Sequence, residues 1–416
     1  MIESPWRALG HRNYALFFVG QGLSLCGTWM QSLAQSWLVY RLTGSPFLLG
    51  LVGFVAQAPV LAFGLVGGLA ADRWPRQRVL MLTQTLALLQ AGALAGLTLS
   101  GHITVGWILA LAAVLGIINA LDMPVRQAFV ADLVPRSDLP SAIGLNSSAF
   151  NAARIVGPSF AGFLVATAGE GLCFLLNALS FLAVIACLLA LRITPKPTAT
   201  HARAAVLLAE GLRYARRTPH VRALLGLIAL LSLTAMPYAV LLPVYAGEIL
   251  KVGPDGLGAL MAATGIGALA GALQIARRRT VRGLGTSIAK AAAFFGFSLL
   301  ALAASTTFWI SLAVLVAVGY GMINGMAGAN TLLQSLVPDN LRGRVMSLYT
   351  LVFLGVAPIG SLLAGAVAAR FGTPLTVALG GLTAIAGAAT FWRALPGIRQ
   401  HVREHNLLPP EEPVAQ

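Results

Sequence analysis

Residues 105–130 read VGWILALAAVLGIINALDMPVRQAFV, an apolar run interrupted by only two charged side chains, Asp122 and Arg126. About 20 helical residues are enough to cross roughly 30 Å of hydrocarbon. A run of this length and composition therefore predicts a membrane-spanning helix. Ionisable side chains inside such a helix are energetically costly, which makes Asp122 and Arg126 the first candidates for a functional site.

The whole chain has the same apolar character. Of its 416 residues, 57% are hydrophobic and 10% are charged, and the mean hydropathy is +0.82. An ordinary globular chain carries about 25% charged residues. The 45 glycines and 21 prolines fit membrane helices, in which both residues are more frequent than in soluble ones. The composition predicts a polytopic membrane protein and excludes disorder, collagen and a disulfide scaffold.

Twelve apolar stretches are long enough to span a membrane, so the predicted fold class is an all-α integral membrane protein with twelve transmembrane helices. Continuous apolar runs favour helices, because a membrane barrel would show short alternating segments. The predicted spans are 14–39, 47–71, 79–99, 105–130, 140–167, 172–191, 221–246, 256–276, 284–304, 307–333, 344–368 and 373–392.

The basic residues predict the orientation, because cytoplasmic loops carry an excess of Lys and Arg. With the N-terminus inside, the inner segments hold 22 of the 28 basic residues. The outer loops hold three, Arg41, Lys251 and Arg370. Both termini are therefore expected in the cytoplasm. The net charge of +15 then reflects topology, and a nucleic-acid partner is not expected.

The longest polar stretch between spans divides the chain into two halves. It covers residues 193–220 and contains an amphipathic helix over 205–217, a pattern typical of a membrane surface. The predicted organisation is a six-helix bundle over 1–192, this linker, a second six-helix bundle over 221–393, and a tail over 394–416.

The two halves share short sequence motifs. Gly116-Ile-Ile-Asn119 matches Gly321-Met-Ile-Asn324, and each is followed by Leu-Val-Pro and then by a glycine-rich span with a proline. The repeat predicts two pseudo-symmetric bundles with a substrate cavity between them, near the middle of the membrane.

The loop after the second span carries a family signature. Gly68-Leu-Ala-Ala-Asp72-Arg73-Trp-Pro75-Arg76-Gln-Arg78 resembles the loop between helices two and three of the major facilitator superfamily. Pro75 and Gln77 depart from that pattern. Together with the twelve spans and the long central linker, the resemblance covers essentially the whole chain and implies the major facilitator fold.

The resemblance implies a cytoplasmic gate around Asp72. In that family the aspartate helps to close the cytoplasmic side, and here it would contact the start of the eleventh span, where it gains from the helix dipole and an arginine partner. The alternative is that Arg73, Arg76 and Arg78 only fix the orientation of the chain in the membrane. The implied gate residues are Gly68, Asp72, Arg73, Arg76, Arg342 and Arg344.

Further motifs point to an antiporter subgroup. The fifth span contains Gly157, Pro158 and Gly162, which resemble the Gly-Pro motif of antiporters in the superfamily. The stretches Asp122-Met-Pro-Val-Arg126-Gln, Leu133-Val-Pro135 and Leu341-Arg-Gly-Arg344 resemble the drug:proton antiporter-3 type, which includes enterobactin exporters and macrolide efflux pumps. This resemblance implies export and proton coupling. Ordinary glycine packing is the alternative for the Gly-Pro pair.

Asp122, Arg126 and Arg154 are the charges expected to cluster inside the membrane. A carboxylate beside two guanidinium groups favours its ionised form, so proton carriage by Asp122 would require the cluster to rearrange. The alternative is a structural or gating cluster that ties the fourth and fifth spans together.

Polar side chains along the first span predict a cavity face, because they recur at helical spacing. Interhelical hydrogen bonding is the alternative. A polar-neutral, aromatic cavity suits amphipathic organic substrates. Its candidate residues are Gln21, Ser24, Thr28, Trp29, Gln31, Gln35, Asn119, Tyr238 and Asn324.

No metal-ligand set, cofactor motif or ATP-binding loop appears, so an enzyme is not expected. The resemblance implies a proton gradient as the energy source. The predicted function is secondary active export of a drug-like or siderophore-like small molecule by alternating access, in the bacterial inner membrane, by a monomer in contact with the lipid bilayer. The alternatives are a lysophospholipid transporter or importer of the same fold and a non-transporting membrane receptor.

Overall fold

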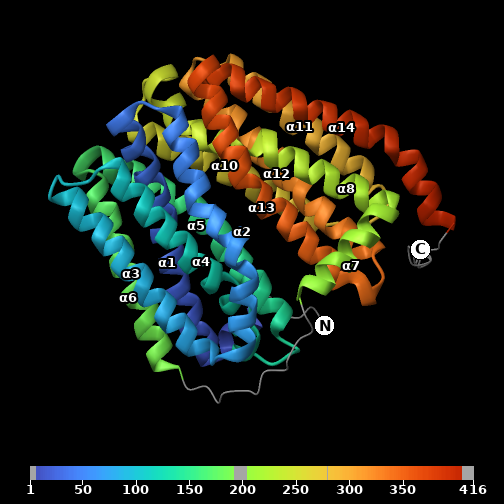
Figure 1. The fold of residues 1–416 in the computed structure, drawn as a ribbon, viewed down its shortest axis with the longest axis horizontal. Coiled ribbons are helices and arrows are strands. Elements are labelled where there is room, and N and C mark those ends of the chain that lie inside the picture. The colour runs from blue at the N-terminus through green and yellow to red at the C-terminus, as the bar shows by residue number, and fades with distance from the viewer. Residues whose placement is uncertain (1–5, 192–203, 279, 405–416) are drawn as a thin grey trace.

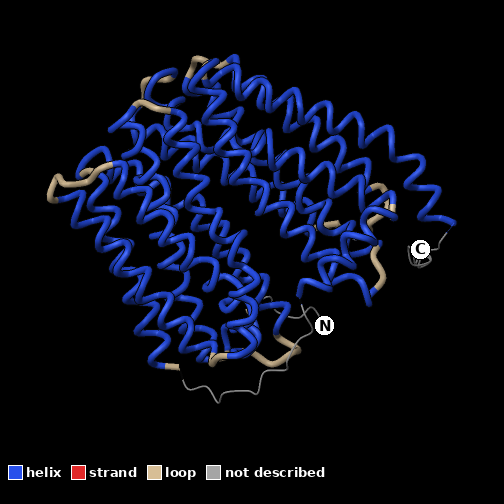
Figure 2. The backbone as a smooth tube through the Cα atoms, in the orientation of Figure 1, coloured by secondary structure: helices blue, strands red, loops and turns tan. Residues whose placement is uncertain are grey.

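The structure is a computed structural model that describes residues 6–191, 204–278 and 280–404. Within these ranges the side chains of 65–66, 68–72, 204–209, 340 and 401–404 are not described. The described chain is helical and contains no strand (Figure 2). Its long helices are α1 (Arg12–Thr43), α2 (Pro46–Arg73), α3 (Arg76–Leu99), α4 (Val105–Leu133), α5 (Leu139–Ala168), α6 (Glu170–Ala190), α10 (Gly253–Ala276), α11 (Leu284–Ala304), α12 (Phe308–Leu336), α13 (Asp339–Phe371) and α14 (Thr373–Glu404).

The seventh long segment is a helix of changing geometry. It runs as α8 (Pro219–Leu230), a π turn η2 (Leu231–Ala235), a 3-10 turn η3 (Met236–Leu241), α9 (Leu242–Val244) and a second π turn η4 (Tyr245–Ile249). Pro237 and Pro243 lie in this stretch, and each removes a backbone donor that a regular α-helix needs. Local π turns occur often at functional sites.

Eleven of the described helical segments are long and apolar enough to cross a membrane. Of the twelve predicted spans, the one outside this set is α1, which is 32 residues long and carries polar side chains along one face. The prediction of an all-helical membrane fold is confirmed, and the helix limits differ from the predicted spans mainly because several helices extend beyond them.

The helices form two bundles that pack by the same scheme. In the first, α2 packs on α4 and α3 packs on α6, while in the second α10 packs on α12 and α11 packs on α14. The bundles meet where α2 contacts α13 and α5 contacts α10 (Figure 1). We call these two contacts the seam. The turns after α5 and α13 also match, because each helix ends at a glycine with positive φ, Gly169 at 81° and Gly372 at 88°.

The seam has two sides, the linker side and the opposite side. The linker side is the one where α1 begins and α14 ends, and α7 (Ala204–Arg217), the linker helix, also lies there (Figure 1). The opposite side holds the short turns after α1, α5 and α13. The linker helix packs on the first turns of α13, where Arg344 Nη1 lies 2.8 Å from Glu210 Oε2.

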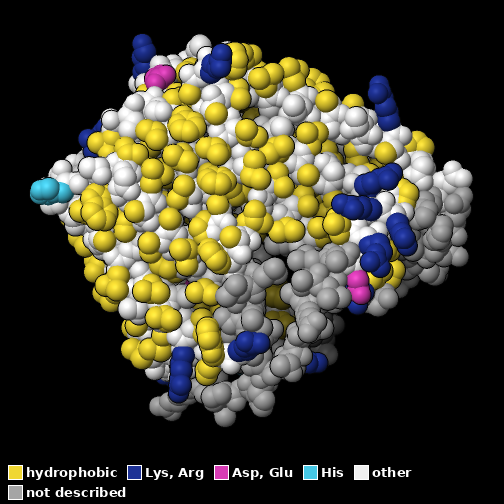
Figure 3. Space-filling model, viewed as in Figure 1, with side chains coloured by type: hydrophobic (Ala, Val, Ile, Leu, Met, Phe, Trp, Pro, Cys, Tyr) yellow, Lys and Arg dark blue, Asp and Glu magenta, His cyan; other side chains and the backbone are white. Residues whose placement is uncertain are grey.

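Apolar side chains cover much of the outer surface, while the charged side chains gather at its ends (Figure 3). The exposed apolar residues include Phe163 on α5, Leu189 on α6 and Phe297 on α11. A contiguous exposed apolar surface of this size marks a membrane protein.

Candidate functional site

Glycines close the seam on the opposite side, where α5 and α10 touch. A Cβ placed on Gly162 would lie 3.0 Å from the Gly258 Cα, and a Cβ on Gly258 would lie 3.0 Å from the Gly162 Cα. The Pro254 carbonyl faces Gly162 at 2.8 Å by the same measure. Small residues allow helix backbones to approach this closely. Gly162 of the predicted Gly-Pro motif thus lies in the seal between the two bundles.

The pseudo-symmetric pair α2 and α13 is closed in the same way. A Cβ on Gly50 would lie 3.0 Å from the Gly365 Cα, and a Cβ on Gly53 would lie 3.4 Å from the Ser361 Cβ. A third contact brings the Tyr40 ring of α1 against Gly247 of η4. The opposite side is therefore shut at three places.

The linker side is different, because the same helix faces are exposed there. On α5, a Cβ on Gly144 would meet no atom within 4 Å, and the neighbouring Ser148 is exposed. On α2, Gly64 also has open space where Gly50 has none. The bundles diverge towards the linker side in Figure 1. The seam is thus sealed on the opposite side and open on the linker side, which we also call the parted side.

The two other residues of the Gly-Pro motif have distinct contacts. A Cβ on Gly157 would lie 2.7 Å from the Trp29 Cβ and 2.8 Å from the Cys26 carbonyl oxygen, so Gly157 packs α5 on α1 within the first bundle. The carbonyl of Pro158 faces Gly258 across the seam. The motif therefore joins α5 to helices of both bundles.

Arg154 lies on α5 between these contacts and the parted side. Its guanidinium carbon stands 5.7 Å from the centre of the Trp29 ring of α1, within cation–π range. Phe150 makes an edge-to-face pair with Trp29, with 5.8 Å between ring centres. Tyr238 of the second bundle lies near Arg154. This group of four side chains, the Arg154 group, spans the seam.

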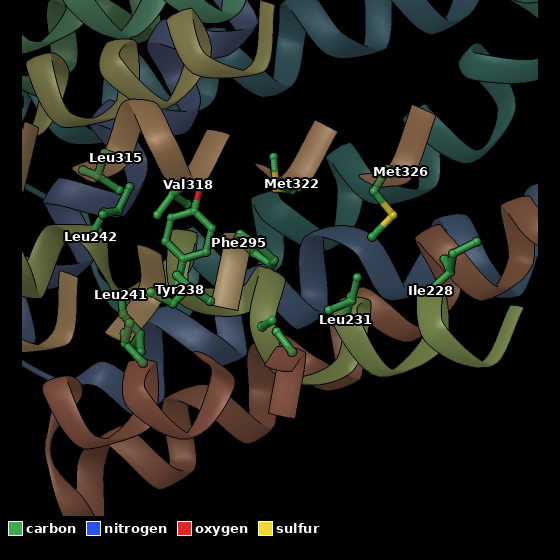
Figure 4. Close-up of a cluster of buried hydrophobic side chains, with 14 of the residues drawn as sticks. Ile228, Leu231, Tyr238, Leu241, Leu242, Phe295, Leu315, Val318, Met322 and Met326 are labelled. Atoms are coloured by element: carbon green, nitrogen blue, oxygen red, sulfur yellow. The ribbon is translucent and has the colours of Figure 1, made fainter. Parts of the chain in front are cut away.

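Tyr238 brings the irregular helix into the Arg154 group. It lies on η3, and its ring makes an edge-to-face contact with Phe295, with 6.2 Å between ring centres. Figure 4 shows it among apolar side chains from several elements, including Leu315, Val318 and Met322. Apolar side chains of the second bundle therefore surround Tyr238, and its side chain also forms a hydrogen bond with Thr264.

Asp122 is buried in the first bundle, with 3% of its surface exposed. Its Oδ1 accepts hydrogen bonds from Thr83 Oγ1 at 2.7 Å and Gln84 Nε2 at 2.8 Å, both from α3. Its Oδ2 lies 3.1 Å from Arg126 Nη2, one turn along α4. The sequence predicted that Arg154 would cluster with Asp122 and Arg126. The structure separates them, because Asp122 faces α3 while Arg154 faces α1 and the seam.

The polar face of α1 divides into two parts. Gln31 is 2% exposed, accepts a hydrogen bond from Asn177 Nδ2 at 2.7 Å and donates one to Gln90 Oε1 at 3.3 Å. Gln90 in turn donates to the Leu111 carbonyl. For Gln31 the structure gives the interhelical alternative and not a cavity face.

The other polar residues of α1 differ in exposure. Gln21, Ser24 and Gln35 are buried, whereas Thr28 is exposed and donates a hydrogen bond to the Ser24 carbonyl at 2.9 Å. Ser32, one turn after Thr28, is also exposed and was missed, because it falls outside the spacing that selected the other side chains. Thr28 and Trp29 are the predicted residues on this helix that keep contact with open space.

The repeated asparagines occupy unlike positions. Asn324 is buried and donates a hydrogen bond from its side chain to Gln274 Oε1, which also accepts one from the Tyr320 hydroxyl. This ties α12 to α10 within the second bundle. Asn119 is half-buried. The Gly116 that precedes it packs α4 on α2, with 2.9 Å between its Cβ position and Pro59 Cγ.

The predicted gate can be followed only at its arginines, since Gly68 and Asp72 belong to the stretch of α2 whose side chains are not described. Arg76 Nη1 lies 2.8 Å from Asp132 Oδ2. Arg342 Nη2 lies 2.6 Å from Asp339 Oδ1. Arg344 pairs with Glu210 of the linker helix. Arg73 is exposed. The ion pairs of Arg76, Arg342 and Arg344 each stay within one bundle and its attached linker helix.

Comparison with known proteins decides the family. The model of the family described as transmembrane secretion effector matches residues 3–415. The chain belongs to this family. It is therefore a multi-pass membrane transporter of the major facilitator superfamily, of efflux type, and not an enzyme.

Relatives of this transporter have varied cargo. It is 26% identical to the staphyloferrin A transporter of Staphylococcus aureus over 94% of this chain and 98% of that one. It is 28% identical to the multidrug efflux pump Tap of Mycolicibacterium fortuitum, covering 84% and 88%. It is 25% identical to the enterobactin exporter EntS of Escherichia coli, covering 88% of each.

Solved structures share the fold of this family member at low identity. A transporter of the POT family, in complex with 5-aminolevulinic acid, aligns with a TM-score of 0.75 at 13% identity, covering 93% of this chain and 96% of that one. A D-xylose–proton symporter aligns with a TM-score of 0.72 at 13% identity, covering 92% and 97%. These likenesses establish the major facilitator fold of the transporter.

Proposed function

We propose that this transporter exports amphipathic small organic molecules of drug or siderophore type by alternating access, driven by proton antiport. The observation that carries the proposal is the asymmetric seam, which Gly162 and Gly258 close on one side and which stands open on the other. A rocking motion of the two bundles about the middle of this seam would exchange the closed and open sides.

We place the linker side in the cytoplasm of a bacterial cell, across the inner membrane. The excess of Arg and Lys in the loops on this side supports that orientation. The structure would then correspond to the state that receives substrate from inside. A single chain supplies both faces of the seam, which supports a monomer as the working unit.

Proton antiport needs a group that changes charge within the membrane, and Asp122 is our candidate. It is the carboxylate buried between α3 and α4, and its partner Arg126 is on the same helix. Intramembrane carboxylates commonly belong to proton relays. The cargo names of the relatives support an organic molecule with both polar and apolar parts.

The test is transport by purified protein in liposomes with an imposed pH gradient. A panel of probes, including a macrolide, a catechol siderophore and a cationic dye, would be added outside the reconstituted vesicles, and the rate of uptake would be followed with the gradient in each direction. We expect at least one probe to move against the proton flow, and to stop when an ionophore removes the gradient. Transport that ignores the gradient would exclude antiport, and failure of every probe to move would exclude export of this substrate class.

The orientation has its own test. Single cysteines at Gly44 and at Arg282, in a background with Cys26, Cys173 and Cys187 replaced by serine, would be labelled in intact cells with a membrane-impermeant maleimide. We expect labelling at residue 44 and protection at residue 282. The reverse pattern would invert the topology.

A further inference from the structure

Arg154 is a cation inside the membrane-spanning part of α5 that faces the seam. It lies eight residues from Gly162, or about 12 Å along the helix, on the parted side of the glycine seal. Its guanidinium stands over Trp29 of the first bundle, and its backbone packs against Gly265 of the second. Arg154 and Trp29 are half-buried and Phe150 is exposed, so these three side chains keep surface that a small molecule can reach, whereas Tyr238 is buried.

The charge of Arg154 has no carboxylate to balance it among the described side chains, and its guanidinium stands over the Trp29 ring. Arg126, in contrast, has Asp122. A charged side chain at the centre of a membrane helix is energetically costly. A cation–π contact offsets part of that cost and leaves the charge only partly stabilised. An anionic ligand would complete this site.

The number of cations favours a carboxylate over a phosphate. A single guanidinium matches one carboxylate in a two-pronged hydrogen bond and leaves no net charge. A phosphate monoester carries a charge of about −1.5 to −2 at pH 7, so beside Arg154 alone it would leave excess negative charge in an apolar seam. The rings of Trp29 and Phe150 lie at the same place and offer a surface for an aromatic body.

We infer that Arg154, Trp29 and Phe150 form a binding subsite for the carboxylate of an amphipathic aromatic substrate that enters from the linker side. This inference rests on the proposed function and specifies one substrate class for it. The carboxylate binds the guanidinium, and the apolar body lies against Trp29 and Phe150. The backbone of Arg154 packs against Gly265 of the second bundle, so a ligand seated here lies at the seam between the two halves.

A set of fluorescent probes with one varied group tests the subsite. Dansylglycine carries a carboxylate, dansylglycinamide a neutral amide, and dansylcadaverine an amine on the same fluorophore. Their affinities for purified full-length protein would be measured by energy transfer from tryptophan. We expect dansylglycine to bind at least about tenfold more tightly than dansylglycinamide, the factor that corresponds to 1.4 kcal/mol.

Three variants locate the preference. Arg154→Gln should abolish the difference between the acid and the amide, and Arg154→Lys should reduce it, since an ammonium keeps the charge but loses the planar fork. Lys290→Gln removes a basic residue from an exposed position on α11, outside the Arg154 group, and should leave the difference unchanged. Size-exclusion profiles and unfolding temperatures would establish that each variant is folded.

Several outcomes overturn the inference. Equal affinity for acid and amide in the parent protein, or a preference that persists in folded Arg154→Gln, removes the carboxylate subsite. Displacement of dansylglycine by dodecyl phosphate at lower concentration than by 1-naphthoic acid would assign the site to a phosphate headgroup instead.

The inference and the proposed function fail separately. If the parent protein binds the acid through Arg154 but moves no probe under a pH gradient, the subsite stands and export fails. If Arg154→Gln exports acidic and neutral probes at the parent rates, export stands and the subsite fails.

Discussion

Gly162 of α5 and Gly258 of α10 face each other directly across the seam, so that a Cβ on either glycine would lie 3.0 Å from the Cα of the other. This contact shuts the opposite side of the transporter. A larger side chain at either position would force the helices apart. Overpacking of this kind costs about 1–3 kcal/mol, which corresponds to a shift of roughly five- to 150-fold in the population of the sealed state.

We therefore predict that Gly162→Val and Gly258→Val reduce export and open the opposite side. The measurement is the rate at which a cysteine at Ser361 reacts with an impermeant maleimide added from that side, which should rise in both variants. Gly96→Val is the matched control, because a Cβ at Gly96 meets no atom within 4 Å. An unchanged labelling rate in Gly162→Val would contradict a sealing role for this contact.

The second seal predicts a crosslink. A Cβ on Gly53 would lie 3.4 Å from the Ser361 Cβ, close to the mean of about 3.8 Å for disulfides. In a cysteine-free background, Gly53→Cys with Ser361→Cys should form a disulfide on mild oxidation and trap the sealed state. Export should then stop and return when the disulfide is reduced.

The crosslink is detected by placing a protease site between residues 193 and 203 and asking whether the two halves stay joined on a denaturing gel. Each single cysteine variant serves as a control for modification without a bond. Full export by the oxidised double variant would show that the seam does not need to open on this side.

Asp122 allows a test of proton coupling that separates it from packing. Asp122→Asn keeps the size of the side chain and part of its hydrogen bonding to Thr83 and Gln84, but removes the charge that Arg126 balances. If Asp122 carries the proton, the variant should lose export driven by a pH gradient and keep exchange of labelled for unlabelled substrate with no gradient. Thr83→Val, which removes a hydrogen bond without altering the charge, should retain gradient-driven export. Normal gradient-driven export by Asp122→Asn would assign the buried pair a structural role.

Much of this architecture could be predicted from the sequence. Apolar runs of sufficient length predict the helices, and the match between Gly116–Asn119 and Gly321–Asn324 predicts the repeat, because both signals are local. The contacts of Gln31 and Arg154 could not be predicted in the same way. Helical spacing shows that polar side chains share a face, but not whether that face meets a cavity or another helix. For Gln31 the decisive fact is Asn177, which lies 146 positions further along the chain.

Gln31 and Thr28 lie one turn apart on α1, and substitutions there should have different effects: on stability at Gln31 and on substrate affinity at Thr28. Gln31→Leu would leave Asn177 and Gln90 without their partner, and interhelical hydrogen bonds in membranes contribute about 0.6–2 kcal/mol. Its unfolding temperature should fall. Thr28→Val alters an exposed position, so its unfolding temperature should stay unchanged while its affinity for substrate changes. The reverse pattern would place Gln31, and not Thr28, beside the substrate.

The linker helix α7 is held on α13 by an ion pair and a close backbone contact. On α7, Glu210 pairs with Arg344 of α13, and a Cβ on the adjacent Gly211 would lie 3.0 Å from the Arg344 carbonyl oxygen. Because both charged side chains are partly exposed, the pair contributes no more than about 1 kcal/mol. Glu210→Arg replaces this attraction with repulsion, and it should increase hydrogen exchange over residues 210–217. Adding Arg344→Glu should restore the parent exchange rate, since the swapped charges attract again. If exchange stays fast in the double variant, the close approach at Gly211, and not the ion pair, holds α7 on α13, and Gly211→Leu alone should then reproduce the effect.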